Sequence, residues 1–437
     1  MPAWTEHVIW WHVYPLGFTG ADTTGTDRTP TLGLRQLESW LDYLLELGAN
    51  GLALGPVFTS LTHGYDTTDY FEVDPRLGSN ADLEHLIGEA HARGIRVMLD
   101  GVFNHVGRDF APLRTAFADP TAPENDLFAT DASGRVATFE GHDALVAFNH
   151  TNPLVADLVF TVMDHWLRLG IDAWRLDAAY SVPVPFWAGV LSRVREAHPE
   201  VYVLGEVLHG DYTEFVTDGL LDSVTQYELW QAIWHATEEA NFYELDWALQ
   251  RNNEFLASFV PYTFIGNHDV TRIASQVSDG RHHAHALALL LTLGGTPAIY
   301  YGDERGLSAI KEERFGGDDA IRPAYPAHPG DLPTDGAAVF ALHQLLIGIR
   351  RRNPWLHTAT SRSILLANTQ LALEVTAGDH SIIVALNIGD EVLILADDPR
   401  GTAPGATPLG ERQLLAGDVH RADGSVEVPP HGWAILS

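Results

Sequence analysis

The chain has 437 residues, 46% hydrophobic and 19% charged, which is the balance of a folded globular protein and not of a disordered one. Its formal net charge of −32 repels phosphate backbones and anionic lipids, so we expect no nucleic acid or membrane partner. The chain contains no cysteine, which excludes disulfides and thiol chemistry, and it has no long apolar run or basic leader; these features predict a cytoplasmic protein.

Short apolar runs alternate with helical patterns over the first 350 residues. A helix is predicted from Ser79 or Asn80 to Arg93, and another is predicted to begin at Asn152 and Pro153. Strands are predicted at residues 8–14, 51–54, 95–99, 171–176, 201–204, 222–226, 262–265 and 298–301. Eight such strands with interleaved helices predict an α/β fold, a (β/α)₈ TIM barrel.

Two stretches interrupt this alternation. The first, which follows the third strand, has no periodicity, and the second contains strand patterns only, at 363–367, 371–375, 381–387, 391–395 and 433–436. We therefore expect a short irregular insertion and a C-terminal antiparallel β-sandwich. The predicted boundaries are 1–105 and 151–354 for the two parts of the barrel, 106–150 for the insertion and 355–437 for the β-domain.

Polar side chains follow four of the predicted strands, at the ends where barrel active sites lie. They are Asp100, Asn104, His105, Arg175, Asp177, Glu206, His268 and Asp269. Paired carboxylates suit glycoside hydrolysis, because one can attack the anomeric carbon while the other protonates the leaving oxygen. Arg175 precedes Asp177 by two residues and can keep it ionised. The two histidines and Asp269 can bind sugar hydroxyls, and Tyr65 offers an aromatic face.

These segments resemble a known family. DGVFNH, GIDAWRLDAA, GEV and FIGNHD are similar, in order, to the four signature regions of glycoside hydrolase family 13, the α-amylase family, and HGYDTTDY and GTPAIYYGDE resemble flanking segments. The resemblance spans residues 8 to about 350. It implies Asp177 as nucleophile, Glu206 as acid/base and Asp269 as transition-state stabiliser. It also implies sugar-binding roles for Tyr65, Asp100, His105, Arg175 and His268.

The sequence departs from the family pattern after the nucleophile. Many α-amylases carry a Lys-His pair where this chain has Ala179 and Tyr180, which argues against ordinary endo-cleavage of starch; Tyr180 is kept as a candidate substrate-binding residue. Asp318 and Arg322 resemble an Asp-x-x-x-Arg element of members that act on short or cyclic maltooligosaccharides, with a loop salt bridge as the alternative. No cofactor or metal is expected, and a calcium site at Asn104 is not favoured.

The leading hypothesis is therefore a retaining glycosidase that cleaves α-glucosidic bonds, mainly α-1,4, in small linear or cyclic α-glucans. Its partner is a neutral oligosaccharide, and the sequence determines no oligomeric state. The alternatives are a transglycosylase with the same active site, a non-catalytic barrel subunit, and a metal-dependent barrel hydrolase, which lacks support in the first strand. The cluster of His282, His283 and His285 is assigned to the surface or to structural roles, because no set of metal partners supports it.

Overall fold

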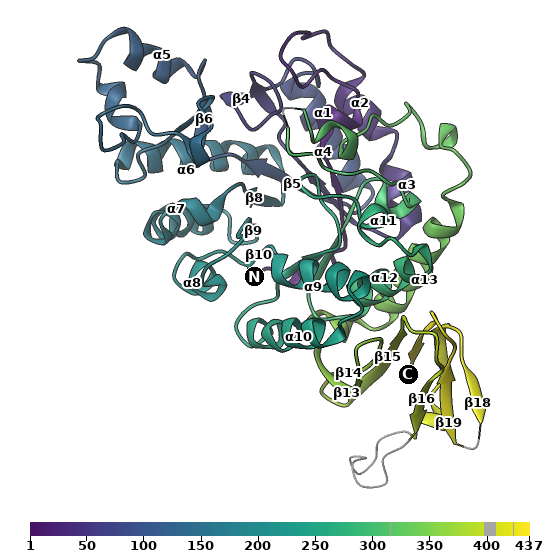
Figure 1. The fold of residues 1–437 in the computed structure, drawn as a ribbon. Helices are drawn as coiled ribbons and strands as arrows, with labels where there is room; N and C mark the ends of the chain where they lie inside the picture. The colour runs from purple at the N-terminus through teal and green to yellow at the C-terminus, as the bar shows by residue number, and fades with distance from the viewer. Residues whose placement is uncertain (315, 397–407, 423) are drawn as a thin grey trace. The chain divides into compact units, whose positions relative to one another are not determined.

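The computed structural model describes residues 1–314, 316–396, 408–422 and 424–437 (Figure 1). The chain forms two compact units, residues 1–225 with 312–333 and residues 226–311 with 334–437. Among the described helices, none combines the length and the apolar character needed to cross a membrane. The predicted domain boundaries stay a prediction.

All eight predicted strands are present, each within two residues of its expected ends, and they belong to one eight-stranded sheet. They are β1 (Trp10–Val13), β2 (Gly51–Leu54), β5 (Arg96–Gly101), β8 (Ala173–Leu176), β9 (Tyr202–Gly205), β10 (Ser223–Val224), β11 (Tyr262–Phe264) and β12 (Thr296–Tyr300). The helices are α1 (Pro15–Phe18), α2 (Gly33–Glu38), α3 (Leu41–Leu47), α4 (Asn80–Ala92), α5 (Ala111–Ala118), α6 (Pro153–Leu169), α7 (Val184–Ala197), α8 (Tyr212–Thr217), α9 (Tyr227–Glu238), α10 (Phe242–Leu256), α11 (Ile273–Gln276), α12 (His283–Thr292) and α13 (Ala337–Arg352). The predicted (β/α)₈ fold class is confirmed.

The first unit contributes six parallel strands in the order β10-β9-β8-β5-β2-β1. The strands β8 and β9 are buried along their whole length, as expected for strands covered on both faces. The two predicted helix starts are confirmed: Ser79 and Asp82 form a capping box for α4, and the Asn152 side chain accepts the Leu154 N–H ahead of α6. The parallel register places the carboxyl ends of these strands at one edge.

Two hairpins lie at that edge of the first unit. The antiparallel pair β3 (Phe58–Ser60) and β4 (Thr67–Val73) follows β2, and the pair β6 (His105–Gly107) and β7 (Leu145–Ala147) encloses the predicted irregular insertion. The insertion also contains α5, which the sequence did not predict. Tyr65 lies in the turn between β3 and β4, and His105 is the first residue of β6.

The second unit pairs β11 with β12 in parallel and continues into two antiparallel sheets. The five-stranded sheet has the order β13-β14-β15-β20-β17 and the three-stranded sheet the order β16-β19-β18. Their bounds are β13 (Thr360–Leu366), β14 (Gln370–Ala377), β15 (His380–Asn387), β16 (Leu393–Ala396), β17 (Leu414–Gly417), β18 (His420–Ala422), β19 (Ser425–Val428) and β20 (Trp433–Leu436). Apolar side chains of both sheets share one buried cluster, so the predicted C-terminal sandwich is present.

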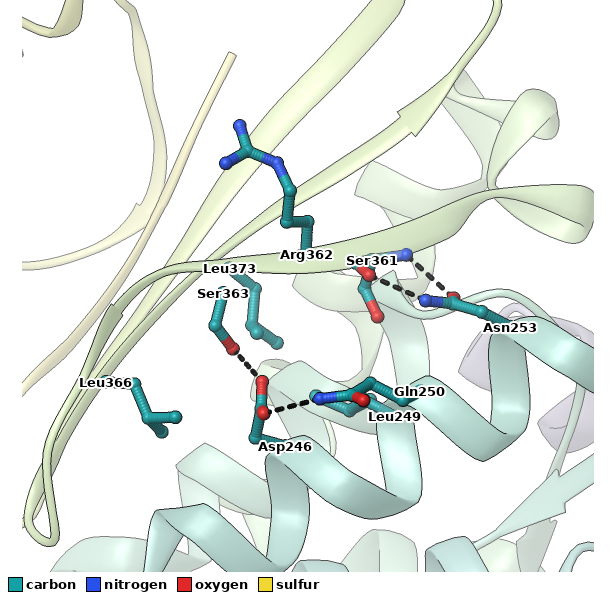
Figure 2. A pocket seen from close by; sticks show the side chains of 9 residues that line it. All are labelled: Asp246, Leu249, Gln250, Asn253, Ser361, Arg362, Ser363, Leu366 and Leu373. Carbon is teal, nitrogen blue, oxygen red and sulfur yellow. Dashed lines mark hydrogen bonds between the residues drawn. The ribbon is translucent and has the colours of Figure 1, made fainter. Parts of the chain in front are cut away.

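Helix α10 packs on strand β13 within the second unit, as Figure 2 shows. Asn253 and the backbone of Ser361 exchange two hydrogen bonds, of 2.7 and 3.0 Å, and Ser363 donates to Asp246. A pocket at this seam is lined by polar side chains of the helix and of β13 together with leucines. Paired side-chain and backbone hydrogen bonds of this kind fix the register between a helix and a strand.

Three buried histidines predict a steep loss of stability in acid. Burial lowers the pKa of His105, His285 and His343 to about 4, below the ordinary value of about 6.5. Between those pH values the unfolded chain binds these protons and the native chain does not, so stability falls as the pH drops from about 6.5 to 4. Three such groups give a maximal slope of about 4 kcal/mol per pH unit.

Urea unfolding midpoints across this pH window test the expectation. The variant His343→Gln removes one of the titrating groups and should flatten the slope by about a third, whereas substitution of the exposed His420 by Gln should leave it unchanged. Stability that stays constant from pH 6.5 to 4 would contradict the assignment of these side chains as buried and neutral.

Candidate active site

Arg175 stands at the centre of a buried charge cluster in the first unit. The register of β5 and β8 pairs Asp100 with Arg175, and Glu206 directly follows β9. Arg175 Nη1 lies 2.8 Å from each Asp100 carboxylate oxygen and 3.3 Å from Asp177 Oδ1, and its Nη2 lies 2.7 Å from Glu206 Oε1. One guanidinium therefore joins the ends of three neighbouring strands.

The electrostatics of this cluster follow from its burial. Asp100 is completely buried, and Arg175, Asp177 and Glu206 are each 7–8% exposed. Burial disfavours the charged form of Arg175, but Asp100, Glu206 and Asp177 outweigh it, and the pKa of Arg175 lies well above its usual value. Three carboxylates against one fixed cation leave the ionised cluster with a net charge of −2. Such a site favours a substrate or transition state that carries positive charge.

The backbone after Asp177 holds the second oxygen of Glu206. Ala178 donates its N–H to Glu206 Oε2 at 2.9 Å and has φ of 45°, a left-handed conformation that alanine rarely adopts. Gly205, at the end of β9, has no space for a side chain, because a Cβ there would lie 2.1 Å from Leu221 Cδ2. Both features fix the Glu206 carboxylate between Arg175 and the Asp177 segment.

Tyr65 and His105 adjoin this cluster. The Tyr65 hydroxyl donates to Asp100 Oδ2 at 3.2 Å. His105 Nε2 donates to the Tyr65 carbonyl at 3.1 Å, and its Nδ1 accepts from the Asn104 side chain at 3.1 Å. The ring stacks on Phe139 with centroids 4.8 Å apart, and burial lowers its pKa to about 4. His105 is therefore a neutral group whose two ring nitrogens are both bonded within the protein, and its sugar-binding role stays a prediction.

Another predicted residue, Tyr180, has a partner that the sequence did not indicate. The Tyr180 hydroxyl donates to Glu140 Oε1 at 2.8 Å, and burial together with Glu140 raises the pKa of Tyr180. Glu140 and Phe139 lie in the irregular insertion, where no periodicity marks individual residues. Tyr70, in the segment HGYDTTDY, was also missed: burial and then the charge of Asp177 raise its pKa.

Asp318 and Arg322 form an ion pair, which was the alternative to their predicted role in binding sugar; that role stays a prediction. Arg322 Nη2 lies 3.0 Å from Asp318 Oδ2, with Arg322 buried and Asp318 one-third exposed. The Arg322 guanidinium lies over the ring of Tyr14 at 4.7 Å, and the Tyr14 hydroxyl donates to the carbonyl of His63, two residues before Tyr65. Tyr14 was not predicted as a site residue. These contacts link the Asp318–Arg322 pair to the loop that carries Tyr65.

His268 and Asp269 belong to the second unit, where they follow β11. His268 Nε2 lies 2.9 Å from Asp269 Oδ2, and Asn267 Oδ1 accepts the Asp269 N–H at 2.8 Å. The Asn267 amide in turn donates to the Tyr227 hydroxyl at 2.9 Å. His268 is buried, and one-third of the Asp269 side chain is exposed. The segment after β11 thus presents one carboxylate that its neighbours hold in a fixed orientation.

Comparison with known proteins decides the family. A family model described as the catalytic domain of alpha amylase matches residues 12–143 and 137–331. The chain belongs to the α-amylase family of glycoside hydrolases. This α-amylase family member is a glycosidase, so the predicted family and the predicted enzyme class are both confirmed. The match includes every predicted site residue, from Tyr65 to Arg322.

Relatives of this α-amylase family member include a cyclomaltodextrinase, a maltogenic amylase and a debranching enzyme. A cyclomaltodextrinase of a Bacillus species is 31% identical over 424 residues, which cover 88% of this chain and 73% of the relative. An intracellular maltogenic amylase of Bacillus subtilis is 28% identical over 347 residues, 70% of this chain and 56% of the relative. The solved debranching enzyme of Nostoc punctiforme, from an acarbose-soaked crystal, is 27% identical with a TM-score of 0.83 and covers 100% of this chain and 99% of that one.

Proposed function

We propose that this enzyme is a retaining hydrolase of α-glucosidic bonds, mainly α-1,4, in small linear or cyclic α-glucans, acting through a covalent glycosyl intermediate on Asp177. The observation that carries the proposal is the contact of one buried guanidinium, Arg175, with both Asp177 and Glu206. The names of the cyclomaltodextrinase and maltogenic amylase relatives support the substrate class.

In the proposed reaction, Asp177 attacks the anomeric carbon while Glu206 gives its proton to the glycosidic oxygen, which leaves as a hydroxyl. Glu206, now ionised, then takes a proton from water as the water oxygen attacks the anomeric carbon and releases Asp177. The sugar leaves with its anomeric configuration retained, because each step inverts it.

The charge cluster suits this sequence of steps. With Glu206 protonated, Asp100, Asp177 and Arg175 sum to −1. Once the sugar is on Asp177, that side chain is a neutral ester and Glu206 has lost its proton, so the sum is again −1. Arg175 therefore faces a constant charge through the first step, and no large reorganisation of the buried site is needed.

For the remaining predicted residues we propose the roles that the resemblance to the family implies. Asp269 would bind ring hydroxyls more strongly as the ring flattens, which stabilises the transition state. Tyr65 would stack on the sugar face. His105 and His268 would hydrogen-bond sugar hydroxyls by exchanging the present contacts of their Nε2 atoms with the Tyr65 carbonyl and with Asp269. Tyr180 would contact the leaving-side sugar. We also propose that the enzyme acts in the cytoplasm, which the name of the intracellular Bacillus subtilis relative supports and cell fractionation would test.

Replacing Asp318 by Ala tests the proposed preference of the enzyme for short substrates. We expect kcat/KM for maltotriose to fall about 10- to 100-fold, the value of one or two lost sugar contacts, and for long amylose by less than about 3-fold. Long chains still bind at other subsites after the substitution, whereas short chains occupy few subsites and lose a larger share of their binding energy. The neighbouring exposed Asp319→Ala is the matched control and should change neither value. Equal losses on both substrates would contradict the assignment.

The overall proposal is tested by incubating the enzyme with maltotriose, a cyclodextrin, isomaltose and starch, and by following the products with and without added glucose as acceptor. Release of α-anomeric short products from maltotriose and cyclodextrin, unchanged by the acceptor, is the expected result. Longer products that accumulate with the acceptor would assign the enzyme to glucan transfer instead. Release of β-anomers would refute retention.

A further inference from the structure

A second cluster of titratable side chains lies outside the proposed active site, in the second unit. Of all the residues that the structure describes, one group brings metal-type ligand atoms within 4.8 Å of one another: Asp279, His282 and His431. Asp279 precedes the short turn Gly280–His282 that leads into α12, and His431 lies between β19 and β20. The cluster therefore joins the start of a barrel helix to the C-terminal sheets.

The three ligand atoms face a common point. His282 Nε2 lies 3.0 Å from His431 Nδ1 and 4.0 Å from Asp279 Oδ2. A tetrahedral zinc ion with bonds of about 2.1 Å separates its ligand atoms by roughly 3.3 Å. The observed separations bracket this value, so small side-chain rotations suffice to coordinate one ion. Two imidazoles and a carboxylate are ligands that zinc commonly takes.

A carboxylate next to the cluster, Asp390, orients the ring of His431. His431 Nε2 donates to Asp390 Oδ1 at 3.0 Å, so Nδ1 carries a lone pair and accepts the hydrogen bond from His282 Nε2. A bound ion would replace that hydrogen bond and take both nitrogens as ligands. A carboxylate behind a ligating histidine is the usual arrangement at protein zinc sites.

The backbone and the local charge also favour a cation. His431 has φ of 56°, a left-handed conformation that costs energy for a residue other than glycine and is typical of functional positions. Asp279, Asp390 and Glu238 lie around the histidines, against the single cation Arg281, which contacts Asp279 at 2.6 Å. The net local charge of −2 attracts a divalent ion, with Arg281 as the competitor for Asp279.

We propose that Asp279, His282 and His431 bind one Zn²⁺ ion, with water in the fourth position, and that the ion ties the start of α12 to the turn before β20. The turn does not depend on the ion for its position, because His285 Nε2 contacts the carbonyls of Asn387 and Gly432 at 3.1 and 3.0 Å. The apo protein and single ligand variants should therefore fold, and zinc should add stability to a structure that already exists.

The proposal is tested on the full chain after treatment with a chelator. Titration with ZnCl₂ should give one ion per chain with a dissociation constant on the order of 1 µM or below. His282→Gln and His431→Gln should each weaken zinc binding at least about 100-fold, and Asp390→Asn about 10-fold through the ring orientation of His431. His380→Gln changes an exposed histidine of β15 outside the cluster and should bind zinc as the parent does.

Two additional measurements distinguish coordination by these three residues from weak, nonspecific binding at the surface. Co²⁺ should give the visible absorption bands of a tetrahedral complex in the parent and not in either histidine variant. Zinc should raise Tm in the parent and in His380→Gln only. Zinc binding of equal strength in the parent and both ligand variants would overturn the proposal, as would a dissociation constant above about 1 mM in the parent.

Discussion

Asp177→Asn should lower kcat/KM for maltotriose by at least about 10⁴-fold, equivalent to roughly 5 kcal/mol of transition-state stabilisation. The asparagine keeps the size of the side chain and an oxygen for the 3.3 Å contact with Arg175, so the fold should survive. It has no anionic oxygen to form the ester, and the first chemical step then has no nucleophile. Steady-state kinetics and a thermal melt measure the two effects.

Rescue by a small anion makes this prediction specific. Azide can enter the space next to residue 177 and attack the anomeric carbon directly, so the variant should form a glycosyl azide of inverted, β configuration. Asp157→Asn is the matched control, because the Asp157 side chain is exposed on α6 and forms an ion pair with Arg193. Substantial residual hydrolysis by Asp177→Asn, with no azide product, would refute the role of Asp177.

Glu206→Gln should separate substrates by their leaving groups. For maltotriose, whose leaving oxygen needs a proton, kcat/KM should fall about 10³-fold or more, the usual contribution of a positioned general acid. For maltosyl fluoride, whose leaving group needs little help, kcat/KM should fall less than about 10-fold. The basic limb of the pH profile should disappear with the acid. Initial rates on both substrates across pH 5–9 measure these effects.

The nearby carboxylate of Glu140 supplies the control for this experiment. Glu140 accepts the Tyr180 hydroxyl and has no contact with Arg175 among the described hydrogen bonds. Glu140→Gln should therefore affect maltotriose and maltosyl fluoride to the same small extent. If Glu206→Gln also slowed both substrates equally, Glu206 would hold the structure of the site and would not be its acid.

The barrel could be predicted from sequence because each of its strands is buried along most of its length. A run such as Arg96–Leu99 or Tyr202–Leu204 is almost continuously apolar, and flanking helical patterns bound it on both sides. The helix N-caps at Ser79 and Asn152 could also be predicted, because their side chains accept hydrogen bonds from backbone N–H groups two or three residues later. The strands β17, β18 and β19 were missed because they are only three or four residues long, and the alternation of SVEV in β19 is too short to indicate a strand by itself.

The residues of the active-site cluster could be predicted from the sequence, but several of their contact partners could not. Position after a barrel strand indicated Asp100, Arg175, Asp177 and Glu206, and the structure joins these four through one guanidinium. The partners of His105 and Tyr180 come from the irregular insertion, where Phe139 and Glu140 carry no local signal. The contacts of these two residues depend on how the insertion folds in three dimensions, which no periodicity in the sequence indicates.

The zinc proposal illustrates the same limit. His282 was visible in the sequence as part of a histidine cluster and was assigned to the surface or to structural roles, because no set of metal partners supported it. The partner His431 follows 149 residues later, and only the packing of the second unit brings the two rings together. Metal sites built from distant segments are invisible to spacing rules, which recognise ligands on one helix or one loop.

Trapping of the glycosyl intermediate tests the central claim most directly. Glu206→Gln, incubated with maltosyl fluoride, should form the covalent intermediate rapidly and hydrolyse it slowly, because the base for the second step is missing. Mass spectrometry of the intact protein should detect one added maltosyl group, and peptide mapping should locate it on Asp177. A sugar attached to any other residue, or hydrolysis of the fluoride to β-maltose without an adduct, would contradict the account.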